Sequence, residues 1–159
     1  FKRKRISAFI IDETVIQIGN QHFWLWFCIE PIHRSILGIY ISEERKMLIA
    51  EKFISSLVEK YGKHTVYTDG GKWYDQACNV IGLKHYLNSS IGKSLMERVN
   101  QYFKDRTELF DDYYTCVKNE CNIFHVYNWI QFFVSMYNDT TFENYFINEL
   151  NDRGEYILS

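Results

Sequence analysis

The order of the predicted elements is the feature that most restricts the fold of this chain. Three strand-like stretches follow one another before the first helical pattern begins. The first covers residues 6–12, with a continuation at 14–18 after a kink, and the others cover 22–29 and 35–42. Short connections between consecutive strands produce an antiparallel meander. Strand and helix patterns alternate after that, and a helix between two strands allows them to run parallel. The order therefore predicts an α/β fold, with a mixed five-stranded sheet of a meander plus parallel strands, flanked by helices.

Helical patterns and two further strands fill the rest of the chain. Between residues 44 and 61, apolar side chains recur at spacings of three and four, as in an amphipathic helix with Ser42 as N-cap and Gly62 at its end. Residues 111–122 are polar and irregular. The other predicted elements are strands at 64–68 and 83–87 and helices at 73–81, 93–110, 124–137 and 141–150. We expect residues 1–110 to form the core and residues 111–159 to form a helical extension packed on it.

Three carboxylates stand close to the ends of predicted elements. Asp12 closes an apolar strand, Asp69 closes a later one before Gly70-Gly71, and Glu97 lies near the start of a helix. Ligands collect outside the carboxyl ends of parallel strands, so we expect the two aspartates to meet. Neighbouring carboxylates repel each other unless a cation lies between them, and hard divalent cations prefer oxygen ligands. The pattern indicates a metal site of the kind that cuts or joins phosphodiesters.

Each carboxylate also has a simpler explanation when it is taken alone. Asp12 can be a strand-end residue that bonds to a turn, and Asp69 before two glycines has an ordinary turn signature. Glu97 and Lys104 are separated by nearly two helical turns, so both can belong to a solvated helix face. The occurrence of all three in this strand order favours a shared site.

The charges are unevenly distributed along the chain. Residues 1–106 carry 16 Lys and Arg against 11 Asp and Glu, whereas residues 107–159 carry 2 against 9, giving the net charge of −2. A basic body with an acidic C-terminal part is compatible with a polyanionic partner for the body. The alternative is an asymmetry of solvated surface charges without a partner.

The cysteines and the apolar runs give weaker indications. No disulfide framework is evident, and the spacing of Cys116, Cys121 and His125 lacks the second pair expected of a zinc site, so reduced thiols in a cytosolic protein are favoured. No apolar run approaches the length that spans a bilayer. Because the first residue is Phe1, we expect a fragment or processed piece of a longer protein.

With these residues placed, the chain resembles the catalytic domain of DDE transposases, in particular the short insertion-sequence transposases of bacteria and archaea. The resemblance covers roughly residues 5–110. The matching segments are Asp12-Glu13-Thr14, Thr68-Asp69-Gly70-Gly71 with Trp73-Tyr74, and the stretch from Glu97 to Thr107. The resemblance implies an RNase H-like fold shared with retroviral integrases, with Asp12, Asp69 and Glu97 as catalytic and metal-binding residues. Asp69 and Glu97 are 28 residues apart, somewhat less than is usual in the family, so Glu13 and Glu108 are alternative third ligands.

The resemblance also implies an activity and its partners. Two Mg²⁺ ions, with Mn²⁺ as a substitute, would support hydrolysis at the transposon ends and transfer of the freed 3′-OH into target DNA. The DNA partners would be the terminal inverted repeats and the target, bound by a homodimer or larger assembly in the prokaryotic cytoplasm, near the nucleoid. The predicted nucleic-acid-binding residues are Lys104, Arg98, Arg106, Lys72 and Lys93.

Two alternatives to a transposase remain open from the sequence. The first is an RNase H-like nuclease that cuts without strand transfer. The second is a truncated, inactive remnant that only binds DNA, since only eleven residues precede Asp12 and the family usually carries a helix-turn-helix segment there.

Overall fold

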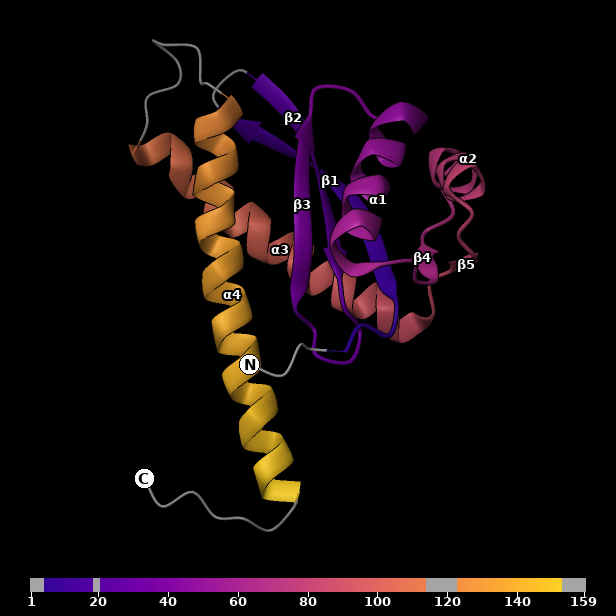
Figure 1. Ribbon diagram of the computed structural model, residues 1–159. Helices are drawn as coiled ribbons and strands as arrows, with labels where there is room; N and C mark the ends of the chain where they lie inside the picture. Colours follow the sequence, from indigo (N-terminus) through magenta and orange to yellow (C-terminus); the bar gives the residue numbers. More distant parts are fainter. Residues whose placement is uncertain (1–4, 19–20, 114–122, 153–159) are drawn as a thin grey trace.

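A single mixed sheet with helices on both faces organises the chain (Figure 1). The computed structural model describes the backbone of residues 5–18, 21–113 and 123–152, and the side chains of residues 5–17, 21–106 and 123–140. Within these ranges the strands are β1 (Phe9–Ile18), β2 (Gln21–Ile29), β3 (Ile36–Ser42), β4 (Val66–Thr68) and β5 (His85–Leu87). The helices are α1 (Met47–Tyr61), α2 (Lys72–Ile81), α3 (Ser90–Tyr113) and α4 (Ile123–Asp152).

The strand order β3-β2-β1-β4-β5 combines an antiparallel and a parallel half. β1 pairs antiparallel with β2, and β2 with β3, because short connections join them. β4 pairs parallel with β1 on one side and with β5 on the other, after the helical crossovers α1 and α2. The predicted mixed five-stranded sheet of a meander plus parallel strands is therefore confirmed.

Alternate residues of β1 contribute to two separate hydrophobic cores, one on each face of the sheet. Ile10 and Ile16 pack with α3 and α4, whereas Phe9 and Ile11 pack with α1 and α2. This is the period of two expected of a strand that is covered on both sides. Figure 1 shows α1 and α2 together on one side of the sheet, and α3 and α4 on the other.

Several predicted boundaries are wrong. The stretches predicted at 6–12 and 14–18 form one continuous strand, because β2 pairs with β1 along its length despite the polar residues in the middle. Ser42 does not cap α1, which begins after Lys46. The Ser42 hydroxyl instead accepts a bond from Trp26 Nε1 at 2.9 Å and donates to the Glu44 carbonyl at 2.7 Å. These bonds hold it at the end of β3.

The C-terminal helix joins the core of the sheet. Val126, Ile130 and Val134 of α4 belong to the same buried cluster as β1 and α3. The Asn138 amide bonds both backbone groups of Ile36, at 2.7 and 2.9 Å, and so protects an edge strand. α4 runs without a break through the position where a second helix was predicted.

The predicted boundary at residue 110 falls inside α3, and the division of the chain there stays a prediction. Cys116 and Cys121, considered as zinc ligands, lie outside the described residues. No helix in the described part of the chain combines the length and apolar character needed to cross a bilayer.

Candidate active site

Asp12 and Asp69 meet because β4 is short. β4 pairs with β1 only at Phe9 and Ile10, and it ends at Thr68. Asp69 therefore leaves the sheet beside the next part of β1, where Asp12 lies. Asp12 is internal to its strand, paired with Phe27 of β2, and the prediction that it closes the strand is wrong. The expected meeting of the two aspartates nevertheless occurs.

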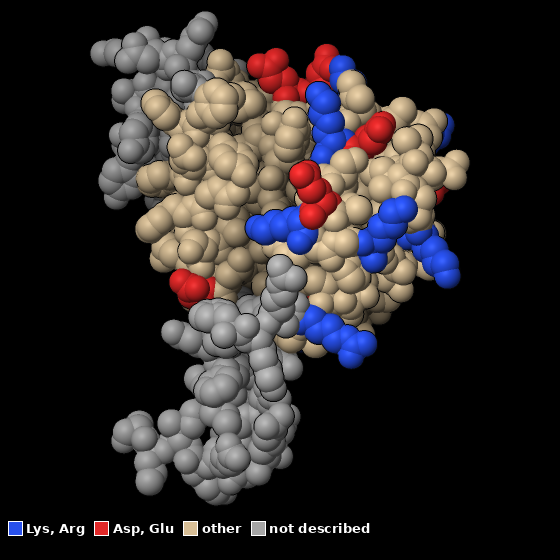
Figure 2. Space-filling model, in the orientation of Figure 1, with Lys and Arg blue, Asp and Glu red and all other residues tan. Residues whose placement is uncertain are grey.

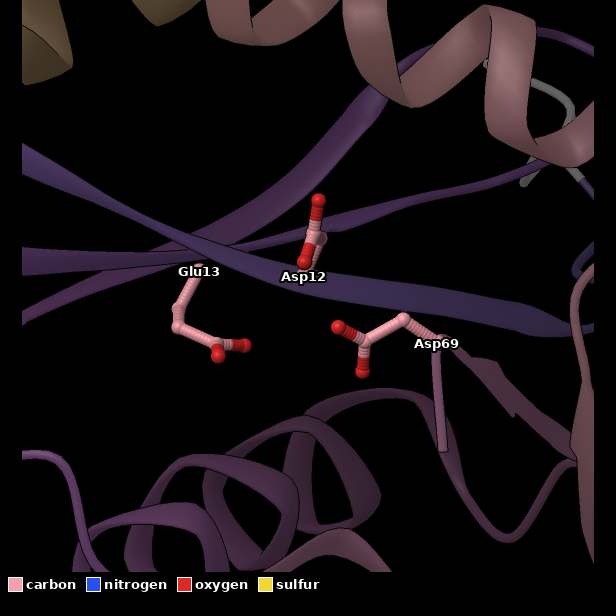
Figure 3. A group of neighbouring side chains, drawn as sticks. All are labelled: Asp12, Glu13 and Asp69. Carbon is pink, nitrogen blue, oxygen red and sulfur yellow. The ribbon is translucent and has the colours of Figure 1, made fainter. Parts of the chain in front are cut away.

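Three carboxylates gather at this point of the sheet. Carboxylate oxygens of Asp12, Glu13 and Asp69 all lie within 4.8 Å of one another. Asp12 and Glu13 point to opposite sides of β1, and Asp69 lies beside them at the end of β4 (Figure 3). A set of hard oxygen donors at this spacing has the chemistry of a Mg²⁺ or Mn²⁺ site.

The turn after β4 holds Asp69 in an exposed position. Gly70 has a φ of 94°, a backbone conformation that favours glycine because other side chains are strained there. The amide of Gly71 donates to Asp69 Oδ1 at 3.1 Å, immediately before α2 begins. One carboxylate oxygen is thus fixed by the backbone, while the exposed side chain stays accessible.

Asp12 lies on the α3 face of the sheet and is half-buried. The amide of Asn100 on α3 donates from Nδ2 to Asp12 Oδ2 at 3.3 Å. Burial raises the pKa of Asp12 from 3.8 to about 6, and the neighbouring Asp69 charge acts in the same direction. A backbone bond at Glu13 and the Asn100 amide oppose this rise in pKa. A cation bound between the aspartates would remove the repulsion.

Glu13 lies on the other face, where protein groups already hold its carboxylate. The hydroxyl of Tyr74, which is fully buried, donates to Glu13 Oε2. Arg45 Nη1 lies 3.6 Å from Glu13 Oε1, and the Glu13 side chain is only 3% exposed. Burial raises the pKa of Glu13 to about 7, although the Tyr74 bond lowers it.

Arg45 is itself held between two aromatic rings. Its guanidinium carbon lies 4.2 Å from the centre of the Trp24 ring and 4.5 Å from that of Trp73. Stacked in this way, Arg45 is kept beside Glu13. The Glu13 carboxylate therefore has a structural environment that differs from that of Asp12.

Glu97, the predicted third ligand, is exposed on α3 and does not belong to the group of three formed by the described residues. It lies three residues before Asn100, close to one helical turn from the residue that contacts Asp12. The side chain of Glu108 lies outside the described residues. Glu13, the other alternative, is the third carboxylate whose oxygen lies close to those of Asp12 and Asp69.

The predicted nucleic-acid-binding residues lie mostly on α3. Lys93, Arg98 and Lys104 are exposed on this helix, and Lys72 is exposed at the start of α2. Arg106 is half-buried, and its guanidinium stacks on Tyr102 at 3.7 Å.

Asn100, Tyr74 and Arg45 are functional candidates for which the sequence predicted no role at the site, although Asn100 and Tyr74 lie in segments that resemble the family. Asn100 follows Glu97 at helical spacing, and this was the one signal that could have identified it. Tyr74 and Arg45 reach Glu13 through long-range packing that no local pattern reports.

Comparison with known proteins gives a consistent result. Residues 6–138 match the family model for the DDE domain of IS240-type transposases. The uncharacterized protein MJ0017 of Methanocaldococcus jannaschii is 28% identical over 138 residues, which are 86% of this chain and 63% of that protein. The chain thus spans less than two thirds of the length of this relative.

Solved structures show the same fold at low sequence identity. The HTLV-2 integrase catalytic core domain in complex with magnesium has a TM-score of 0.59 and 15% identity, covering 83% of this chain and 87% of that one. The catalytic core domain of BIV integrase has a TM-score of 0.57 and 14% identity, covering 94% and 99%.

Proposed function

Because this chain belongs to the DDE-domain family of IS240-type transposases, we propose that it is the catalytic domain of a DNA transposase. It hydrolyses phosphodiesters at transposon ends and transfers the freed 3′-OH into target DNA, with a divalent metal. The observation that carries this proposal is the convergence of Asp12 and Asp69, which are 57 residues apart in sequence, to a separation of at most 4.8 Å between ligand oxygens.

Asp12 and Asp69 fit a divalent cation. Both offer carboxylate oxygens, and Asp69 is exposed, so a metal and a phosphate can reach the site. When bound, a pair of Mg²⁺ or Mn²⁺ ions supplies an activated water and charge stabilisation for the leaving 3′ oxygen. The protein's part is to hold the ligands in place before the DNA arrives. The magnesium in the related HTLV-2 integrase structure supports the choice of metal.

We assign the third catalytic carboxylate to Glu97. Glu13 is engaged by Tyr74 and Arg45 on the face of the sheet opposite to Asp12. Glu97 belongs to α3, the helix that contacts Asp12 through Asn100, and its side chain is exposed. The position of Glu97 in the segment that resembles the family supports the same assignment.

The exposed basic residues of α3 are the proposed DNA contacts. Lys93, Arg98 and Lys104 share the helix with Glu97, and Lys72 begins the helix that follows Asp69. Arg98 and Arg34 line a cavity of about 750 Å³ between α3 and β1, and none of the described residues around it is acidic. Such cations bind phosphate oxygens and position the duplex without reading its sequence. Arg106, stacked on Tyr102, has a pre-oriented guanidinium for the same purpose.

A second copy of the chain is the proposed partner on DNA. The exposed face of α4 carries Phe124, Phe132 and Met136, which are 70%, 60% and 49% exposed and follow helical spacing. Figure 2 shows few charged side chains over the part of the surface that α4 and β3 occupy. We propose that residues 1–110 form the catalytic core and that residues 111–159 contribute this surface. The assembly acts on DNA in the cytoplasm.

A strand-transfer assay tests the proposal. Labelled DNA that ends in the element's terminal repeat, incubated with the protein, Mn²⁺ and a target duplex, should yield both cleaved and joined products. Asp12→Asn and Asp69→Asn should yield neither product. Cleavage without joining would indicate a nuclease instead. If Mn²⁺ does not stabilise the fold of the wild-type protein, the chain is instead an inactive remnant that only binds DNA.

A further inference from the structure

A chain of hydrogen bonds lies directly behind the Asp69 turn and joins three elements. Thr68 Oγ1 on β4 lies 2.5 Å from His85 Nε2 on β5. His85 Nδ1 lies 2.5 Å from Asp75 Oδ1 on α2. Thr68 immediately precedes Asp69, so this series of hydrogen bonds ends next to the proposed metal ligand.

The direction of each bond follows from what each group can do. The ionised Asp75 carboxylate only accepts, so it selects the ring form with hydrogen on Nδ1. In the neutral ring, Nε2 is then an acceptor and takes the Thr68 hydroxyl hydrogen. Thr68 Oγ1 keeps a lone pair, which accepts the Gly70 amide at 3.0 Å. The hydroxyl is therefore used in both directions, and its orientation is fixed.

Burial excludes a nucleophilic role for the Thr68 hydroxyl. The order Thr, His, Asp resembles that of a hydrolase triad, in which the hydroxyl must reach the substrate. Thr68 is 0% exposed, and the His85 side chain is only 8% exposed. No substrate can approach Thr68 Oγ1, so the bonds serve to hold the backbone.

We propose that Thr68, His85 and Asp75 are positioning residues that set Asp69 for metal binding. This role rests on the proposed function, and the three residues act through the Asp69 turn. The Thr68 hydroxyl accepts the Gly70 backbone amide, and the Thr68 carbonyl accepts the Asn88 backbone amide at 2.8 Å. The turn is thereby fixed to β5 and α2. A ligand that is ordered in advance loses less conformational entropy when the cation binds.

Thr68→Val tests this proposal, with Thr68→Ser as its matched control. Valine keeps the shape and loses both hydrogen bonds, whereas serine keeps the hydroxyl. Mn²⁺ affinity, measured by calorimetry without DNA, should fall about 10- to 100-fold for Thr68→Val and stay within about twofold for Thr68→Ser. His85→Ala should weaken Mn²⁺ in the same direction, and it provides the answer if Thr68→Val fails to fold. Cleavage by either variant should recover as Mn²⁺ is raised.

The outcomes separate this inference from the function on which it rests. Wild-type Mn²⁺ affinity in a folded Thr68→Val or His85→Ala variant overturns the positioning role alone. A wild-type chain that does not bind Mn²⁺ overturns both proposals. Weakened binding in Thr68→Ser equal to that in Thr68→Val also overturns the role, because the hydroxyl would then not be the cause.

Discussion

Asp12 and Glu13 are adjacent in the sequence, yet the two faces of β1 give them different environments. The Asp12 carboxylate points to the α3 face, where it accepts a bond from the Asn100 amide, and an oxygen of the exposed Asp69 lies within 4.8 Å of it. On the α1 and α2 face, the Glu13 carboxylate is enclosed by the Tyr74 hydroxyl and the Arg45 guanidinium. Asp12 has one side-chain partner among the bonds described, whereas the groups around Glu13 provide the charge and hydrogen bonds that a buried carboxylate needs.

The difference shows that proximity alone does not make a metal ligand. All three oxygens lie within 4.8 Å, but Glu13 would have to give up its protein partners to bind a cation. If Glu13 bound a cation, Arg45 would lose its carboxylate partner, which costs free energy. Binding of a cation by Asp12 breaks no such ion pair. We therefore propose that Asp12 is catalytic and that Glu13 contributes to the fold, and four measurements test this difference between the two carboxylates.

The largest effect is expected from Asp12→Asn. This change should lower DNA cleavage by about 1000-fold or more, since a bound cation contributes several kcal/mol to the reaction. It should also abolish the stabilisation by Mn²⁺ in a thermal melt. An Asp12→Asn protein that keeps both properties would show that the α3 face is not the metal side.

The second measurement compares Glu97→Gln with Glu13→Gln in the cleavage assay. Glu97→Gln should lose activity by about 100-fold or more while the fold keeps its stability, because a ligand is removed from an exposed position. Glu13→Gln should cleave nearly as the wild type does. The reverse result would make Glu13 the third ligand and contradict the comparison.

The third measurement is the pH dependence of stability without metal. Burial raises the pKa of Asp12 to about 6 and that of Glu13 to about 7, from 3.8 and 4.5. Between about pH 4 and pH 7 these two carboxyls thus bind more protons in the folded state than in the unfolded state, so their contribution makes the fold less stable as the pH rises. Urea unfolding across this range should show a shallower decline in Asp12→Asn and Glu13→Gln.

Mn²⁺ should reverse this decline, because it binds the deprotonated carboxylates and so stabilises more strongly as the pH rises through about 6. Wild-type and variant pH profiles that coincide would show that these two carboxyls do not have the raised pKa values.

The smallest effect is expected from Tyr74→Phe. Loss of the hydroxyl removes one hydrogen bond to Glu13 and should destabilise the fold by about 1 kcal/mol, measured by urea unfolding. Mn²⁺ affinity should be unchanged, since the bond between Tyr74 and Glu13 lies on the face that α1 and α2 cover. A clear loss of Mn²⁺ binding would show that Glu13 takes part in the metal site together with Asp12 and Asp69.

Local patterns in the sequence were sufficient for the elements and for two of the carboxylates. A period of two in strands and a period near 3.6 in helices can be read from neighbouring residues, and the order of elements then restricts the sheet to few topologies. Asp12 and Asp69 could be predicted because both follow apolar strand segments. The sequence indicated a kink between residues 12 and 14, whereas the pairing with β2 keeps β1 continuous through its polar centre.

A mixed sheet with two aspartates near its centre could be predicted from the amino-acid sequence alone. Which other groups surround these aspartates depends on long-range packing. The register of β4 against Phe9 and Ile10 brings Asp69 beside Asp12, and the packing of α3 places Asn100 on the same side. The period of a strand separates its two faces, but it does not say which helix covers each face. For that reason the partners of Glu13 were visible only in three dimensions.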